Sequence, residues 1–125
     1  PGLLLHDIGD ALRSCCNPRG ETPSSALEDI NFDPDLFGAW LNGYSGEAGL
    51  LLTDSDKTHI VQASRVIAFE LGLRFVTDHL EGDHYFKTGF RGHNLIRAKV
   101  QFRLVQSIED QFANLLNIVT TRINR

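Results

Sequence analysis

Apolar residues recur every three to four positions along most of this chain, as they do on one face of an α-helix. The strongest such segment covers residues 54–80. A helix with apolar residues on two sides needs neighbours on both, so we expect the rest of the chain to surround this one on most sides. Its two apolar stripes are Ile60, Ala63, Ile67 and Leu71, and Val66, Phe69, Leu73, Val76 and Leu80.

A second long helix is predicted from near His93 or Asn94 almost to the C-terminus. Gly82 ends the first long helix, and few alternating β-branched runs occur anywhere. The sequence therefore predicts one all-α domain over residues 1–125, a helical bundle dominated by two long antiparallel helices joined by the loop over residues 82–92. The apolar stripe of the second helix is Val105, Ile108, Phe112, Leu115, Val119 and Ile123.

Two shorter helices are predicted before this pair. Residues 7–17 form the first, with Asp7 near its N-terminus, where a carboxylate meets free N–H groups. Residues 2–5 look like the tail of a loop. Asp33 and Pro34 begin the second as N-cap and first helical residue. Its apolar positions are Leu36, Phe37, Trp40 and Leu41, and Gly43, Gly46 and Gly49 are expected to end it.

The segment between these helices, residues 21–31, is rich in Ser and Pro, so we expect a loop with one turn. The net charge of −4 at pH 7 argues against nucleic acid or an anionic membrane as the main partner, because both attract clustered cations. No apolar run approaches the ~20 residues of a membrane-spanning helix, and no signal peptide is visible. Cys15 and Cys16 are neighbours, so we expect two reduced thiols, which fits a cytoplasmic setting.

Glu70, Arg74 and Asp78 stand four residues apart on the first long helix. On a solvated face they would form i,i+4 ion pairs, worth a few tenths of a kcal/mol each. Because they lie between two apolar stripes, partial burial is also expected, and then Glu70 and Asp78 would hold the Arg74 guanidinium between them. The guanidinium would keep donors free for a sugar hydroxyl or a phosphate. Spacing alone favours the structural role.

Tyr85 follows Gly82 by three residues, which brings it near the last turns of the first long helix. A tyrosine at this position commonly fastens the loop to the core, and its hydroxyl needs water or a polar partner. A pocket floored by Arg74 and walled by Tyr85 is compatible with this geometry, although neither residue type is specific for a ligand.

Other polar clusters leave alternatives open. His79, Asp83 and His84 at the helix end could hold a metal, with solvated histidines as the default. Asp7 and Asp10 could form a metal-binding or base pair, although such a pair more often caps a helix. No phosphate-binding loop, dinucleotide fingerprint or nucleophile elbow is present. The cations expected on a solvated face are Arg91, Arg97, Lys99 and Arg103.

Two stretches resemble a known family. The sequence HDIGDALRSCCN, residues 6–17, is similar to the segment that follows the metal-binding Asp loop in aminoglycoside phosphotransferase-like kinases. FELGLRF and DHLEGDHYFK, within residues 69–87, and HNLIRAKVQFRLVQSIE, residues 93–109, resemble the C-terminal end of the N-acetylhexosamine 1-kinase branch. The resemblance covers most of the chain outside residues 19–57.

The resemblance implies a two-lobed kinase that uses ATP and Mg²⁺ to phosphorylate a sugar hydroxyl. The family's catalytic and metal-binding aspartates lie upstream of the part matched here. This chain is therefore expected to be a C-terminal fragment with the helical subdomain of the protein-kinase-like fold, inactive alone, with no catalytic residue or metal ligand. Arg74 matches a hexosamine-binding arginine and Tyr85 a tyrosine of the same pocket, with Glu70 and Asp78 orienting Arg74. Asp7 matches a structural aspartate that braces the catalytic region.

The partners that this hypothesis implies are the N-terminal and catalytic parts of the parent chain and a hexosamine sugar. A second hypothesis is a non-catalytic helical interaction module that forms a homodimer through an exposed apolar face. A third, remote hypothesis is desulfation, because members of the kinase branch are sometimes labelled mucin-desulfating proteins. The run CNPR at residues 16–19 does not keep the CxPxR spacing of a sulfatase nucleophile segment.

Overall fold

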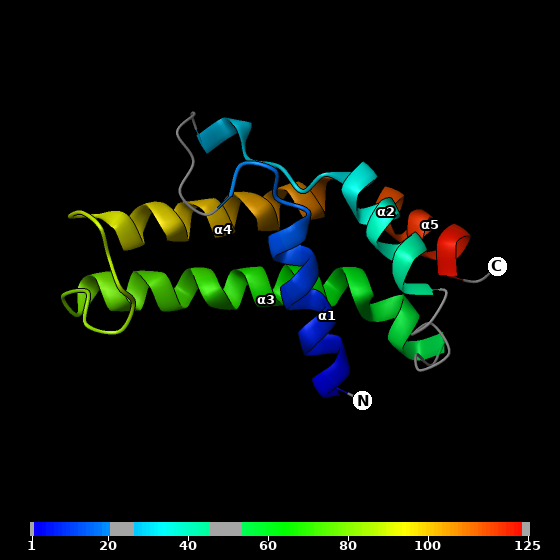
Figure 1. Cartoon of the computed structure of the whole chain (residues 1–125), viewed down its shortest axis with the longest axis horizontal. Coiled ribbons are helices and arrows are strands. Elements are labelled where there is room, and N and C mark those ends of the chain that lie inside the picture. The colour runs from blue at the N-terminus through cyan, green and yellow to red at the C-terminus, as the bar shows by residue number, and fades with distance from the viewer. Residues whose placement is uncertain (1, 21–26, 46–53, 124–125) are drawn as a thin grey trace.

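The structure, a computed structural model, describes residues 2–20, 27–45 and 54–123. Within these ranges every regular element is helical, so the predicted all-α class is confirmed. Helices α3 and α4 lie side by side and antiparallel, α1 crosses α3, and α2 packs on α5 at the end opposite the α3–α4 loop (Figure 1). The elements are α1 (Gly2–Cys15), the 3-10 turn η1 (Leu27–Asp29), α2 (Pro34–Ser45), α3 (Asp54–Leu80), α4 (His93–Asp110) and α5 (Phe112–Ile123).

The core lies where α1, α3 and α4 meet and continues between α2 and α5. The first predicted stripe of α3 faces it, with Ile60 and Ile67 buried and Ala63 and Leu71 half-buried. Each fully buried Leu, Ile or Phe contributes about 1.5–3 kcal/mol relative to an exposed position. The fully buried apolar side chains that bring these helices together include Leu12, Ile30, Phe32, Phe37, Leu41, Ile60, Leu104, Ile108 and Leu115.

The second apolar stripe of α3 is largely exposed, so the prediction that the chain surrounds this helix is wrong. Val66, Phe69 and Leu73 keep 43%, 46% and 47% of their surface accessible, and Leu80 keeps 77%. The reason is that α1 and α4 both pack on the other side of α3. At the margin, the Phe69 ring lies 6.0 Å from the ring of Phe102 on α4.

Two glycines allow the helices to approach closely. A Cβ atom at Gly9 would lie 2.8 Å from Ile67 Cδ1 and 2.9 Å from the Ala63 carbonyl, so α1 rests directly on the α3 backbone. A Cβ atom at Gly72 would lie 2.6 Å from Phe102 Cε1. Such distances are shorter than ordinary van der Waals contacts. At Gly9 the obstacle is backbone, so that crossing requires the absence of a side chain, whereas at Gly72 the Phe102 ring would have to shift.

The second long helix is interrupted at Gln111, which the periodicity did not predict. Gln111 leaves the helical conformation, with φ −121° and ψ 25°, between α4 and α5. Its side-chain Nε2 donates to the Phe32 carbonyl at 2.6 Å, while the Phe32 N–H donates to Ser107 Oγ at 2.9 Å. These bonds fasten the chain before α2 to the junction. The predicted stripe is still buried on both sides of the break, at Val105, Ile108, Leu115 and Val119.

The predictions for the first two helices need two corrections. Helix α1 already begins at Gly2, so residues 2–5 are helical and Asp7 lies in the second turn rather than near the helix start. The Asp33 cap is confirmed, because its Oδ1 accepts the Asp35 N–H at 2.8 Å. Helix α2 continues through Gly43 to Ser45 instead of ending there.

Element η1 is the turn expected within residues 21–31, of which residues 21–26 lie outside the described residues. Gly46 and Gly49 also lie outside them. Among the described helices, none is long and apolar enough to cross a membrane.

Candidate functional site

A groove of about 530 Å³ opens at the C-terminal end of α3, beside the loop that follows it. Four of the residues that the sequence singled out line this one groove: Glu70, Arg74, Asp78 and Tyr85. This confirms the prediction that Arg74 and Tyr85 line one pocket. The remaining lining residues are Leu73, Thr77, Glu81, His84 and Phe86.

Arg74 and Tyr85 meet from different elements, the helix and the loop. Arg74 Nη2 donates to Tyr85 Oη at 3.4 Å. The guanidinium carbon also lies 5.6 Å from the centre of the Tyr85 ring and 5.7 Å from that of Phe86. Cation–π contacts at exposed sites contribute about 0.5–1 kcal/mol. Both side chains are exposed, and of the five guanidinium N–H donors the structure engages one, which leaves the others for a ligand.

The predicted ladder of ion pairs is absent. Neither Glu70 nor Asp78 hydrogen-bonds or pairs with Arg74, although the structure describes all three, and Glu70 and Arg74 are exposed rather than partly buried. The reason is competition from other partners. Arg74 donates to Tyr85, and Asp78 is buried under the loop, where it accepts from Tyr85 and Asn94, while Glu70 stays in solvent. The expectation that these carboxylates orient Arg74 by contact is therefore not met.

Asp78 instead anchors the loop. Its Oδ1 accepts the Tyr85 N–H at 2.7 Å, and its Oδ2 accepts the Phe86 N–H at 3.0 Å. Asn94 Nδ2 donates to the same Oδ2 at 2.7 Å. Burial alone would raise the pKa of this carboxyl, but the hydrogen bonds from Phe86, Tyr85, Asn94 and the His84 N–H outweigh burial and hold the pKa below its usual value.

Asn94 and Arg97 belong to the same network, and sequence reasoning missed both. Arg97 Nη1 donates to Asn94 Oδ1 at 3.0 Å and to the Lys87 carbonyl at 2.9 Å. Its guanidinium carbon lies 5.7 Å from the centre of the Phe75 ring. The expectation of a solvated face is thus wrong for Arg97. The sequence offered one signal for Asn94, namely that it is a polar residue in the second position of its helix.

The histidines near the groove do not converge. His84 is exposed in the groove, whereas His79 is half-buried and its Nδ1 has no hydrogen-bond partner among the described residues. Asp83, between them in sequence, accepts a hydrogen bond from Asn94 Nδ2 at 3.0 Å. In the part of the chain that the structure describes, no group of three or more His, Cys, Asp or Glu side chains is arranged to hold a metal ion.

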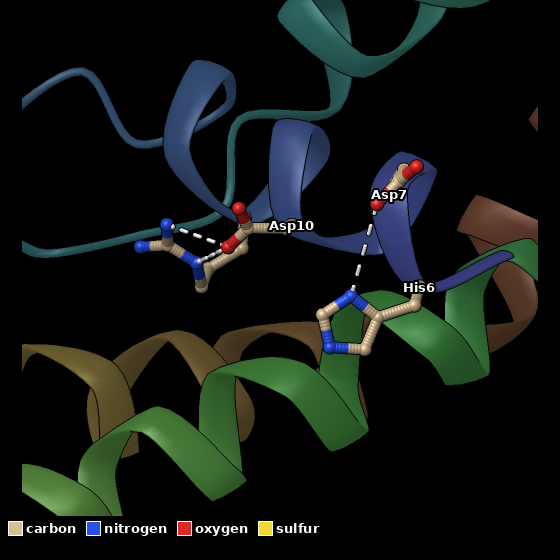
Figure 2. A network of polar contacts seen from close by, with 4 residues as sticks. His6, Asp7 and Asp10 are labelled. Atoms are coloured by element: carbon tan, nitrogen blue, oxygen red, sulfur yellow. Dashed lines mark hydrogen bonds and ion pairs between the residues drawn. The ribbon is translucent and has the colours of Figure 1, made fainter. Parts of the chain in front are cut away.

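Asp7 and Asp10 lie far from the groove, on α1. Asp10 Oδ1 accepts from Arg13 Nε at 3.0 Å and Nη2 at 2.9 Å, so its charge is balanced by a mostly buried arginine. Asp7 is exposed, and its closest polar contact is His6 Nδ1 at 4.0 Å. Each carboxylate is directed to a different partner (Figure 2), so the two do not form a pair. The bracing role of Asp7 stays a prediction.

The two cysteines are free, with Cys15 exposed and Cys16 buried. Burial, with smaller contributions from Cys15 and Asp33, raises the pKa of the Cys16 thiol to about 12. A thiol with so high a pKa stays protonated at neutral pH and is a poor nucleophile. The free thiols agree with the predicted reduced state, and the buried, protonated Cys16 fits a structural role.

A comparison with known protein families found none that matches this chain. The function is therefore inferred from the groove itself. The groove has the size of a small-molecule site, and such sites combine apolar walls with a few polar groups.

Proposed function

We propose that this chain is the substrate-side helical domain of an ATP-dependent sugar 1-phosphotransferase that acts on an N-acetylhexosamine-like sugar. In this proposal the groove at the end of α3 binds the sugar. The preceding part of a kinase supplies the catalytic residues and the sites for ATP and Mg²⁺, so the chain alone is inactive. The setting is the cytoplasm, where ATP is available.

The observation that supports the proposal is the meeting of Arg74 and Tyr85 on one groove. A sugar offers hydroxyls that both donate and accept hydrogen bonds, and an apolar face of C–H groups. Arg74 can donate to ring or hydroxyl oxygens, and the Tyr85 hydroxyl can donate or accept. The exposed Tyr85 ring and Leu73 offer apolar surface beside these polar groups.

The groove also carries acceptors. Glu70 and Glu81 line it and are exposed, so their carboxylates can accept hydrogen bonds from sugar hydroxyls. Arg74 and the glutamates together give both kinds of hydrogen-bonding partner that a polyhydroxyl ligand needs.

The experiment is a kinetic comparison in a full-length parent kinase. Arg74→Ala should raise the KM for N-acetylglucosamine at least about tenfold, the effect of losing about 1.4 kcal/mol of binding, and leave the KM for ATP unchanged. Arg19→Ala is the matched control, because Arg19 is exposed and lies outside the groove. Unchanged sugar kinetics in Arg74→Ala would overturn the proposal.

The exposed stripe of α3 favours a second candidate, a helical interaction module that forms a homodimer. Val66, Phe69 and Leu73 are exposed apolar side chains at helical spacing on α3, and exposed apolar surface of this kind marks protein contacts. Sedimentation of the chain over a range of concentrations tests this. Leu73→Ser should reduce self-association. Leu36→Ser should not, because Leu36 is a similarly exposed leucine that lies on α2. A monomer at every concentration would rule this candidate out. No feature of the described residues favours the third hypothesis, desulfation.

A further inference from the structure

Asn94 is a fully buried polar residue behind the wall of the groove. Its single Nδ2 donates to two carboxylates, Asp78 Oδ2 at 2.7 Å and Asp83 Oδ1 at 3.0 Å. Its Oδ1 accepts from Arg97 Nη1 at 3.0 Å. One amide thus connects the end of α3, the loop and the first turn of α4.

Two of the three side-chain bonds of Asn94 leave its own helix. The N-cap of α4 is Gly92, and among the described residues no side-chain bond caps that helix. The bond from Arg97 stays within α4, whereas the bonds to Asp78 and Asp83 lead to α3 and the loop, and all three partners are charged groups. Hydrogen bonds to charged partners are among the strong ones in proteins, and here they hold Asp78 and Asp83 in place around one donor.

Asp78, which Asn94 holds in place, in turn holds the wall of the groove. Asp78 accepts the N–H groups of Tyr85 and Phe86, which fixes the backbone of the wall. The Phe86 ring packs on Phe75, with centroids 4.6 Å apart, and the Tyr85 ring stands edge-on to Phe86 at 4.9 Å. Without the Asn94 donor, two neighbouring carboxylates would face each other with only backbone groups to balance Asp78.

We infer that Asn94 is a positioning residue of the groove: by holding Asp78 and Asp83 it keeps Tyr85 at the distance from Arg74 that sugar binding requires. The inference rests on the proposed function, because it assigns Asn94 a part in binding the sugar. Asn94 itself touches no ligand. It acts through Asp78, one hydrogen bond behind the wall.

The test measures binding of N-acetylglucosamine to the wild-type chain and to Asn94→Asp by NMR titration. The substitution keeps the shape of the side chain but replaces the donor with a carboxyl beside Asp78 and Asp83. We expect sugar binding to weaken about tenfold or more at neutral pH. Asn114→Asp is the matched control, because Asn114 is exposed on α5 at the far end of the bundle.

A pH series separates positioning from a general loss of structure. The introduced carboxyl would face Asp78 from α3, Asp83 from the loop and Arg97 from α4, and the two neighbouring carboxylates favour its protonated form. Once protonated, it can again donate to Asp78. Relative to the wild-type chain, affinity in Asn94→Asp should therefore recover as the pH falls, whereas the Asn114→Asp ratio should stay constant. His84, which also lines the groove, is unchanged in all three proteins, so its contribution cancels in these ratios.

The outcomes are distinct. If Asn94→Asp binds the sugar as tightly as the wild-type chain, with unchanged Trp40 fluorescence to show a folded bundle, the inference is overturned and the proposed function stands. If the wild-type chain binds no sugar, the proposed function is overturned, and the inference that rests on it falls with it. If the variant does not fold, the wild-type titration decides: saturating sugar should shift the Asn94 side-chain resonances together with the Tyr85 amide, and unmoved Asn94 resonances overturn the inference.

Discussion

The Asp78 carboxylate accepts the backbone N–H of Tyr85 at 2.7 Å, across the turn that ends α3. Asp78 is therefore a support of the loop and not a partner of Arg74. The turn itself contains Gly82 and Asp83 with positive φ values of 97° and 62°. Asp83 is a non-glycine residue in this uncommon conformation, which needs surrounding contacts to be maintained. Its N–H donates to the Asp78 carbonyl at 2.8 Å, so Asp78 supports the turn with both its main chain and its side chain.

The first prediction follows from the lowered pKa of Asp78. Because the folded protein favours the ionised carboxylate, this group adds stability at pH values above its ordinary pKa of 3.8. That contribution is lost as the pH falls through the lower pKa of the folded state. Asp78→Asn should lower the Tm by a constant amount at neutral pH. The difference from the wild-type chain should shrink below about pH 3.8, as thermal unfolding at a series of pH values can show.

The control for this prediction is Asp35→Asn, because Asp35 is exposed on α2 and far from the loop. Its Tm difference from the wild-type chain should be small. A Tm difference for Asp78→Asn that grows as the pH falls would contradict the assignment of Asp78 as an ionised anchor.

The second prediction concerns the Tyr85 hydroxyl. Tyr85→Phe keeps the ring that stacks near Arg74 and removes only the oxygen that accepts from Arg74 Nη2. Because the side chain is 73% exposed, stability should change by less than about 0.5 kcal/mol. Sugar affinity should fall by up to about tenfold, as expected for one hydrogen bond. Calorimetric titration measures the affinity, and Tyr85→Ala, which also removes the ring, should weaken binding further. Equal affinities in the wild-type chain and Tyr85→Phe would remove the hydroxyl from the site.

The third prediction tests the close crossing of α1 over α3. In Gly9→Ala the new methyl group would overlap the backbone of Ala63, which cannot move without displacing α3. We expect a net loss of about 1–3 kcal/mol in the free energy of unfolding, despite the better helix propensity of alanine. Denaturant unfolding measures the change. Gly43→Ala on α2 is the matched control: among the described residues, no atom beyond its own helix backbone lies within 4 Å of its new Cβ, so it should gain about 0.5–1 kcal/mol.

The long elements of the fold were predictable because their signal is local. The apolar periodicity of residues 54–80 extends over many turns, and α3 spans these same residues. The break at Gln111 was not predictable in this way. It depends on a hydrogen bond to Phe32, 79 positions away in sequence. The same holds for Gly9 and Gly72, whose role appears only when the neighbouring helix is in place.

In the groove, too, some features follow from local spacing and others depend on distant parts of the chain. Tyr85 lies near Arg74 because a short turn links the loop to the helix end, and spacing reveals this. Spacing does not reveal which partners Asp78 binds, because these are N–H groups of the folded loop and the side chain of Asn94 on another helix. The role of Asn94 could not be predicted for a further reason. It depends on Asp78 and Asp83, which the antiparallel packing of α3 and α4 brings to Asn94 from 16 and 11 positions away.

The last prediction concerns Gln101, a fully buried side chain on α4. Neither its Oε1 nor its Nε2 has a hydrogen-bond partner among the described residues. Burying an amide without partners is unfavourable, and leucine has a similar volume without the polar atoms. Gln101→Leu should therefore raise the free energy of unfolding by about 1–3 kcal/mol, measured by denaturant unfolding. Gln106→Leu, an exposed position on the same helix, should change it by less than about 0.5 kcal/mol. A loss of stability in Gln101→Leu would show that the buried amide is satisfied in solution, and that its polarity is part of how the core is held together.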